Sequence, residues 1–125
     1  MQEREISIVV PCYNEAPALP HLYIELVALK QGLSGVSFEF VLVDDGSTDG
    51  TRDVIRDLSQ KDADVRYVFF SRNFGKEAAL LAGLEAARGK YVAVMDADLQ
   101  DPPSLLPEMY SAVKSGEYDC AATRR

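Results

Sequence analysis

The stretch "FEFVLVDDGSTDGT" (residues 38–51) contains the change of chemistry that decides the fold. Its first seven residues are mostly apolar, which is typical of a strand covered on both faces. Two acids, a glycine and small polar residues follow, and these residue types form turns and helix starts. A buried strand that ends in an acidic turn and leads into a helix is the repeating unit of a parallel α/β sheet.

The same pattern recurs along the chain. Short runs rich in valine, isoleucine, phenylalanine and tyrosine predict further strands at residues 6–11, 65–70, 91–96 and 118–123. Apolar residues at helical spacing predict helices near residues 19–29, 54–58, 76–89 and 101–116. This alternation predicts one α/β domain with a mainly parallel sheet, right-handed crossovers and helices on both faces.

The third predicted helix lies in "KEAALLAGLEAARG". Leu80, Leu81 and Leu84 recur on one side of it, so we expect them to form its buried face. Gly89 is the expected C-cap, because glycine adopts the left-handed conformation that ends many helices.

Composition narrows the class of protein. The chain has 125 residues, of which 47% are hydrophobic and 26% are charged, as in a soluble globular domain. Its 20 acidic and 13 basic residues give a net charge of −7, which argues against nucleic acid as a partner. A phosphorylated small molecule remains compatible, because a bound divalent ion can reverse the local sign of the charge.

Cellular location follows from the cysteines and the apolar runs. Cys12 and Cys120 form no C-x-x-C pair, so reduced cysteines are the simpler interpretation and a disulfide is the alternative. No apolar run is long enough to span a membrane, and the start lacks a secretory signal pattern, so we expect a cytoplasmic location. The chain stops directly after its last predicted strand, and we therefore expect it to be truncated.

The predicted loops gather polar residues at one edge of the sheet. With the common strand order 3-2-1-4, ligands bind at the carboxyl ends of the first and fourth strands. The polar segments at or beside that point are residues 11–15, 44–50 and 96–100. We therefore expect these three segments to form one site.

Asp96 and Asp98 are the sharpest signal in this set. In an extended chain, residues two apart point the same way about 7 Å apart, so their carboxylates would repel without a cation. Carboxylates and an amide oxygen such as that of Gln100 suit Mg²⁺ or Mn²⁺. The alternative is a solvated turn in which Asp101 caps the next helix.

Other polar residues carry weaker signals. Asp44 ends a strand beside the crevice, whereas the residues after it, Asp45, Gly46, Ser47 and Asp49, are explained by turn and cap chemistry. Tyr13 and Glu15 could face a nucleotide, with Pro11 shaping the turn before them.

A basic segment stands at the start of the third predicted helix. Arg72, Asn73 and Lys76 there suit an anion, and a solvated basic turn is the equal alternative. The one histidine, His21, lacks a catalytic or metal-binding partner and is expected at the surface.

Taken together, "VVPCYNE", "VLVDDGSTDGT", "RNFGKEAALLAG" and "VAVMDADLQDPP" resemble family 2 glycosyltransferases of the GT-A fold, a Rossmann-like three-layer α/β/α architecture. The nearest resemblance is to the polyprenyl-phosphate group, which includes dolichol-phosphate mannose synthases. The resemblance spans nearly the whole chain, with the motifs in order.

The resemblance implies roles for individual residues. It implies that Pro11, Tyr13, Glu15, Asp44 and Asp96 line the nucleotide pocket. It gives Asp96 and Asp98 the catalytic roles and makes Asp96, Asp98 and Gln100 the ligands of Mg²⁺ or Mn²⁺. Lys76 and Arg124 are the candidates for binding the donor diphosphate or the acceptor phosphate.

The resemblance also implies a reaction. A sugar would pass from a UDP- or GDP-sugar to a polyprenyl phosphate, with inversion at the anomeric carbon, at the cytoplasmic face of the membrane. Acceptor-binding residues and membrane-associated segments are expected beyond residue 125, and the isolated chain need not be active. The sequence is compatible with a homo-oligomer and does not specify one.

Three alternatives compete with this reading. A non-catalytic nucleotide-sugar-binding module would use the same site, because a fold does not guarantee chemistry. A family 2 transferase acting on a sugar hydroxyl of a polysaccharide would need a carboxylate base from a later segment. A haloacid-dehalogenase-type phosphatase carries its D-x-D after the first strand rather than the fourth, which makes this class the weakest fit.

Overall fold

The computed structural model describes residues 4–98 and contains a four-stranded parallel sheet. The strand order is β3-β2-β1-β4, the common order on which the expected position of the site was based. The strands are β1 (Arg4–Cys12), β2 (Phe38–Asp44), β3 (Val65–Phe69) and β4 (Gly89–Val94). The helix predicted at 101–116 and the strand predicted at 118–123 lie outside the described residues.

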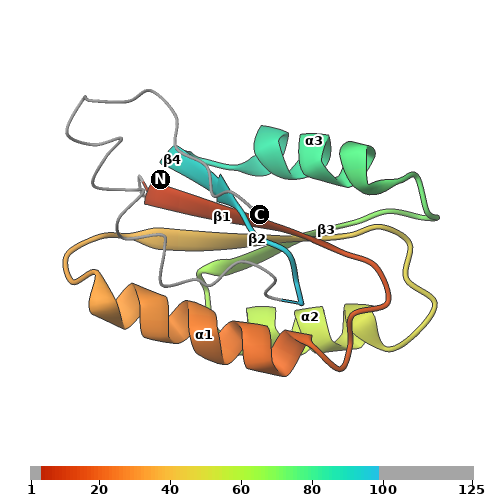
Figure 1. Cartoon of the computed structure of the whole chain (residues 1–125), viewed down its shortest axis with the longest axis horizontal. Coiled ribbons are helices and arrows are strands. Elements are labelled where there is room, and N and C mark those ends of the chain that lie inside the picture. The colour runs from red at the N-terminus through yellow and green to blue at the C-terminus, as the bar shows by residue number, and fades with distance from the viewer. Residues whose placement is uncertain (1–3, 99–125) are drawn as a thin grey trace.

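Three helices cover the sheet in the described part of the chain: α1 (Leu19–Gly32), α2 (Thr51–Lys61) and α3 (Lys76–Ala86). In Figure 1, α1 and α2 lie on one face of the sheet and α3 lies on the other, so the molecule has three layers. Right-handed crossovers require this arrangement, because the chain reverses direction across the sheet between β3 and β4. Within residues 4–98, no helix is long and apolar enough to cross a membrane.

The main core lies between the sheet and the two helices α1 and α2. Alternate residues of β1, including Ile8 and Val10, face this layer and pack with Leu22 and Leu26 of α1. Val9 faces the other side, toward α3. All of these side chains are almost completely buried, and each contributes roughly 1.5–3 kcal/mol to stability. Both faces of β1 and β2 are therefore covered, which explains their apolar runs.

Helix α3 packs through small residues, so the prediction of a leucine face is wrong. Leu81 and Leu84 are 58% and 48% exposed, whereas Ala79 and Gly83 are buried. A Cβ atom on Gly83 would lie 2.3 Å from Cγ1 of Val9. The helix therefore lies so close to the sheet that only alanine and glycine fit between them.

Gly89 begins β4 and does not cap α3, which corrects a second prediction. The helix ends at Ala86, with Ala87 as its C-cap, and the strand starts two residues earlier than predicted. A Cβ atom at Gly89 would lie 2.5 Å from Oγ of Ser7 and 2.6 Å from its amide nitrogen. Glycine is thus required here by the close approach of β4 to β1.

A buried carboxylate, that of Glu39 in β2, fixes this junction. It accepts hydrogen bonds from Oγ of Ser7 (2.5 Å), from the amide of Arg88 (2.5 Å) and from Nη1 of Arg66 (2.8 Å). Oγ of Ser7 in turn accepts a hydrogen bond from the amide of Gly89. Burial raises the pKa of Glu39, but the hydrogen bonds and the charge of Arg66 outweigh burial and hold that pKa below its usual value. The start of β4 is therefore tied to β1, β2 and β3 at once.

Candidate active site

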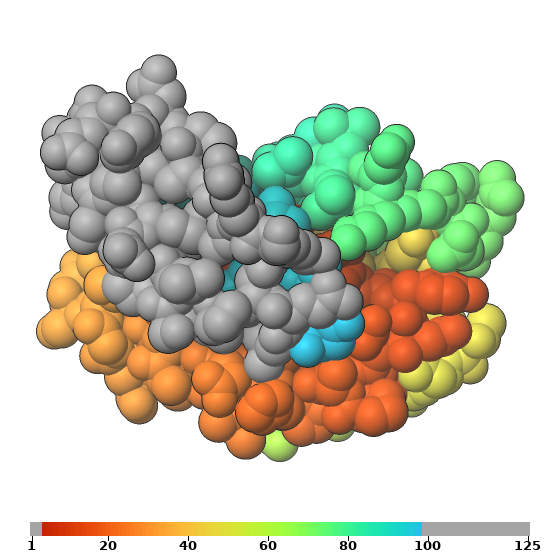
Figure 2. Space-filling model, viewed as in Figure 1, coloured from red at the N-terminus to blue at the C-terminus, as the bar shows by residue number. Residues whose placement is uncertain are grey.

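A pocket opens at the carboxyl ends of β1 and β4, the position expected for a ligand in a sheet of this order. In Figure 2, the blue residues that end the described chain reach the surface beside the red-orange residues that follow β1. The lining residues come from the loops after β1, β2 and β4 and from the start of α3; they are Pro11, Cys12, Tyr13, Glu15, Asp45, Lys76, Ala79, Asp96, Ala97 and Asp98.

Most of the predicted site residues meet in this pocket. Six of them line it: Pro11, Tyr13, Glu15, Lys76, Asp96 and Asp98. Asp44 is not among the lining residues but is completely buried at the end of β2, next to the lining residue Asp45, and Gln100 and Arg124 lie outside the described residues. Segments more than 80 residues apart in the sequence, such as those of Tyr13 and Asp96, therefore form one surface.

Carboxylates dominate the electrostatics of the pocket. The pKa of Glu15 is raised by burial first and then by the charges of Asp98, Asp49 and Asp96. The pocket is therefore a region of negative potential that favours a cation.

The donor set fits a hard divalent ion. Asp96 and Asp98 present carboxylate oxygens, although no cluster of three or more potential ligand side chains occurs within residues 4–98. Mg²⁺ is commonly held by one or two carboxylates, with water and substrate phosphates completing the shell. Two carboxylates that line one pocket are therefore compatible with such an ion.

The two aspartates do not lie in an extended segment, which corrects the predicted geometry. Strand β4 ends at Val94, and the backbone turns at Ala97 and Asp98. Asp96 therefore follows the strand by two residues, and Asp98 stands in the turn after it. The expected spacing of an extended chain does not apply to this pair.

Lys76 supplies a positive charge to the same pocket. Its Nζ lies 3.1 Å from Oδ1 of Asp96. Gly75, which precedes α3, has φ +105°, a backbone conformation that favours glycine. This turn brings the first residue of α3 to the pocket.

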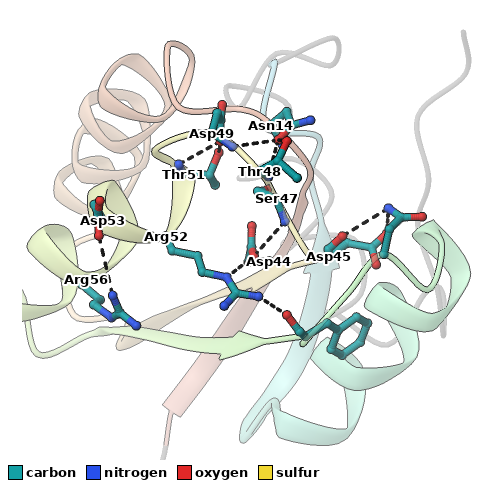
Figure 3. Close-up of polar contacts among 12 residues, drawn as sticks. Asn14, Asp44, Asp45, Ser47, Thr48, Asp49, Thr51, Arg52, Asp53 and Arg56 are labelled. Carbon is teal, nitrogen blue, oxygen red and sulfur yellow. Dashed lines mark hydrogen bonds and ion pairs between the residues drawn. The ribbon is translucent and has the colours of Figure 1, made fainter.

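Asp44 is completely buried and has one satisfied oxygen and one unsatisfied oxygen (Figure 3). Its Oδ2 accepts hydrogen bonds from Nε of Arg52 (2.9 Å) and from the amide of Ser47 (3.1 Å). Its Oδ1 has no hydrogen-bond partner among the described residues. A buried acceptor without a donor costs stability, so this oxygen suits a donor group of a ligand.

Asp45 has a larger role than the turn predicted for it. Its carboxylate accepts hydrogen bonds from the amides of Phe74 (2.7 Å) and Gly75 (3.1 Å) and from the side-chain amide of Asn73 (3.1 Å). The turn itself is as expected, since Gly46 has φ +72°. Asp45 therefore clamps the loop before α3 while it lines the pocket. The sequence gives no signal of this, because its partners lie about 30 residues away.

Asn14 joins the loops after β1 and β2 (Figure 3). Its side-chain oxygen accepts hydrogen bonds from the backbone amides of Thr48 (2.9 Å) and Asp49 (3.3 Å). Its backbone amide donates a hydrogen bond to Oγ of Ser47 (2.9 Å). Asp49 accepts a hydrogen bond from the amide of Thr51, but the N-cap of α2 is Gly50, without a side-chain cap hydrogen bond, so Asp49 does not take the N-cap position predicted for it. The neighbouring Glu15 is thereby held at the pocket.

The three layers and the strand order match the GT-A fold of solved glycosyltransferases, and an acidic pocket lies at the ends of β1 and β4. The family model "Glycosyl transferase family 2" matches residues 7–125, and the chain belongs to that family.

Curated relatives agree with the family. An undecaprenyl-phosphate 4-deoxy-4-formamido-L-arabinose transferase of Aeromonas hydrophila is 40% identical over 121 residues, which are 96% of this chain and 36% of that protein. A Synechocystis protein named as an uncharacterized glycosyltransferase is 43% identical over 121 residues, 97% of this chain and 38% of that protein. The chain thus spans little more than a third of the length of these relatives.

Solved structures agree with the fold. A mannosyltransferase from Pyrobaculum calidifontis in complex with GDP-Man and Mn²⁺ gives a TM-score of 0.66 at 28% identity, covering 82% of this chain and 34% of that one. TarS of S. aureus in complex with UDP-GlcNAc gives a TM-score of 0.63 at 28% identity, covering 85% of this chain and 32% of that one.

Proposed function

We propose that this chain is the nucleotide-sugar-binding part of a metal-dependent, inverting glycosyltransferase that transfers a sugar to a polyprenyl phosphate. The observation that carries the proposal is the meeting of Glu15, Lys76, Asp96 and Asp98 in one pocket at the ends of β1 and β4. The similarity to an undecaprenyl-phosphate transferase supports the lipid acceptor.

The pocket acids receive the metal. Asp96 and Asp98, together with Gln100, hold Mg²⁺ or Mn²⁺ in this proposal. When bound, the ion neutralises charge that develops on the diphosphate leaving group. A structural neighbour was solved with GDP-Man and Mn²⁺, which supports a divalent ion in this role.

The nucleotide lies against β1 and β2. Pro11, Tyr13 and Glu15 line its pocket, and the buried Asp44 ends β2 next to Asp45, which also lines it. The unsatisfied Oδ1 of Asp44 is an acceptor, and uracil and guanine both present ring N–H donors. This chemistry suits UDP- and GDP-sugars alike, and the neighbours solved with UDP-GlcNAc and GDP-Man include both nucleotides.

A phosphate acceptor simplifies the chemistry. A lipid phosphate is largely ionised at neutral pH, so its oxygen can attack the anomeric carbon without a strong general base. A sugar hydroxyl would need a carboxylate base to remove its proton. Lys76 and Arg124 are the candidates for holding phosphate groups, and a lipid acceptor would put the reaction at the cytoplasmic face of the membrane.

Transfer of labelled sugar tests the acceptor class. The longest form of the protein that contains this chain is incubated with Mn²⁺ and radiolabelled UDP- or GDP-sugars, and with either undecaprenyl phosphate or a polysaccharide. We expect label in the lipid fraction, and loss of that label in Asp98→Ala. Label in the polysaccharide alone would favour the hydroxyl-acceptor alternative, and nucleotide binding without any transfer would favour a non-catalytic module.

A further inference from the structure

We propose that Lys76 and the divalent cation are alternative partners of Asp96. In the protein without substrate, the Lys76 ammonium pairs with Asp96; when metal and nucleotide sugar bind, it moves to the diphosphate. This inference rests on the proposed function. It adds that the ammonium of Lys76 competes with the metal ion for the carboxylate of Asp96.

The first argument is that the backbone of Lys76 is fixed. The amides of Phe74 and Gly75, just before it, donate to the buried carboxylate of Asp45. The amide of Ala79 donates to the carbonyl oxygen of Gly75 (3.1 Å), and Ala79 is completely buried against the sheet. Any change of partner must therefore come from the side chain and not from a loop.

The second argument is that the ion pair is asymmetric. The side chain of Asp96 is 17% exposed, whereas that of Lys76 is 63% exposed. The carboxylate is therefore held in the pocket, while the ammonium reaches it from solvent on a flexible stem. Exposed ion pairs contribute little to stability, so a divalent ion can replace the ammonium.

The third argument is the charge around the pair. Asp98 and Glu15 line the same pocket, and the charges of Asp98 and Asp96 act on Glu15. These acids favour a cation at Asp96 whether it is an ammonium or a metal ion, so the two compete for one place. Two cations side by side would repel, which drives the ammonium away when the metal binds.

The fourth argument is that the displaced ammonium has a suitable destination. Lys76 is the first residue of α3, and the amides of the first helical turn have no acceptor inside the helix. These amides and the ammonium both attract a phosphate group. A diphosphate that brings a metal ion to Asp96 would thus meet Lys76 at the same end of α3.

Two affinities test this proposal: the affinity for Mn²⁺ alone and the affinity for the nucleotide sugar. Mn²⁺ affinity is measured by the electron paramagnetic resonance of free Mn²⁺, and nucleotide-sugar affinity by calorimetry at saturating Mn²⁺. In Lys76→Met, we expect Mn²⁺ alone to bind roughly two- to fivefold more tightly, because its competitor is gone. We expect the UDP- or GDP-sugar to bind at least about tenfold more weakly, because a charged phosphate contact is lost.

Two variants serve as controls. Lys61→Met removes the same charge from the last turn of α2 and should leave both affinities unchanged, which excludes a general effect of net charge. Lys76→Arg keeps a cation at the site and should keep Mn²⁺ binding near that of the wild type.

The result that supports the proposal is a pair of opposite shifts. Mn²⁺ affinity that is unchanged or weaker in Lys76→Met, while Asp98→Ala abolishes Mn²⁺ binding, overturns the competition and leaves the proposed function intact. If the wild-type protein binds neither Mn²⁺ nor a nucleotide sugar, the proposed function fails and this inference fails with it.

Discussion

Asp44 holds the turn after β2 and, in the proposed function, also binds the nucleotide. One of its oxygens is held by Arg52 and by the amide of Ser47, while the other has no hydrogen-bond partner among the described residues. Burial of such a group costs stability that a ligand donor can return. Arg52 and Ser47 fix the orientation of Asp44, which would preorganise its other oxygen for the proposed nucleotide.

Asp44→Asn tests this role. The amide keeps the shape of the side chain but loses the charge beside Arg52, so we expect nucleotide-sugar affinity to fall at least about tenfold and stability to fall by about 1–3 kcal/mol. Calorimetry and urea denaturation measure the two quantities. Asp53→Asn removes the same charge from an exposed site on α2 and should change neither. Unaltered nucleotide affinity in Asp44→Asn would contradict the assignment.

At the scale of elements, β4 and α3 carry site residues at one end and meet at the other. Lys76 begins α3, and Asp96 and Asp98 follow β4. The two elements are joined by Ala87 and Arg88 alone, beside the buried carboxylate of Glu39. The position of this junction on the sheet therefore determines where Lys76 and the two aspartates lie along the direction of the strands.

Gly89→Ala tests how tightly β4 lies against β1. A Cβ at this position would come within 2.6 Å of the amide nitrogen of Ser7, so β4 must shift, and we expect the free energy of unfolding to fall by about 1–3 kcal/mol. Gly50→Ala is the matched control, because a Cβ there meets nothing within 4 Å. Equal stabilities of the two variants in urea would show that the close approach is unimportant.

The carboxylate of Glu39 predicts a pH dependence. Its pKa lies below the ordinary value of 4.5, so its stabilising contribution is present above that value and is lost as pH falls through the lower, folded-state pKa. We expect the free energy of unfolding to decrease below about pH 4.5, and this decrease to be smaller in Glu39→Gln. At pH 7 that variant should be less stable by about 3 kcal/mol, because Arg66 loses its charged partner. Denaturation curves at several pH values check both statements, and identical pH profiles would refute the role of Glu39.

At the scale of the whole molecule, the sequence predicts the order of strands and helices more accurately than it predicts the contacts between side chains. Alternating strands and helices predict a parallel sheet with right-handed crossovers, and the strand order is the common one for such sheets. The convergence of Tyr13, Glu15 and Asp96 follows from that order. Sequence patterns do not report distances between layers, which is why the helical spacing predicts Leu81 and Leu84 in the core although both are exposed.

The sequence also does not predict hydrogen-bond and ion-pair partners from separate loops. The sequence distinguishes Asp44 by its place at the end of a strand but does not predict its partner Arg52, and Asp45, which clamps the loop that ends at Gly75, has the sequence context of an ordinary turn residue. Hydrogen bonds of this kind depend on how two loops meet in space. The sequence therefore identifies the edge of the sheet and the pocket acids Glu15, Asp96 and Asp98, but not that Asp45 both lines the pocket and holds the loop before α3.

Metal-dependent nucleotide-sugar binding tests the central claim most directly. Calorimetry with UDP- and GDP-sugars, with and without Mn²⁺, is performed on the wild type, on Asp98→Ala and on Asp57→Ala, whose exposed acid lies on α2. We predict binding that requires Mn²⁺ and that falls at least about tenfold in Asp98→Ala while Asp57→Ala behaves as the wild type. Binding that is indifferent both to Mn²⁺ and to the loss of the Asp98 carboxylate would contradict the account.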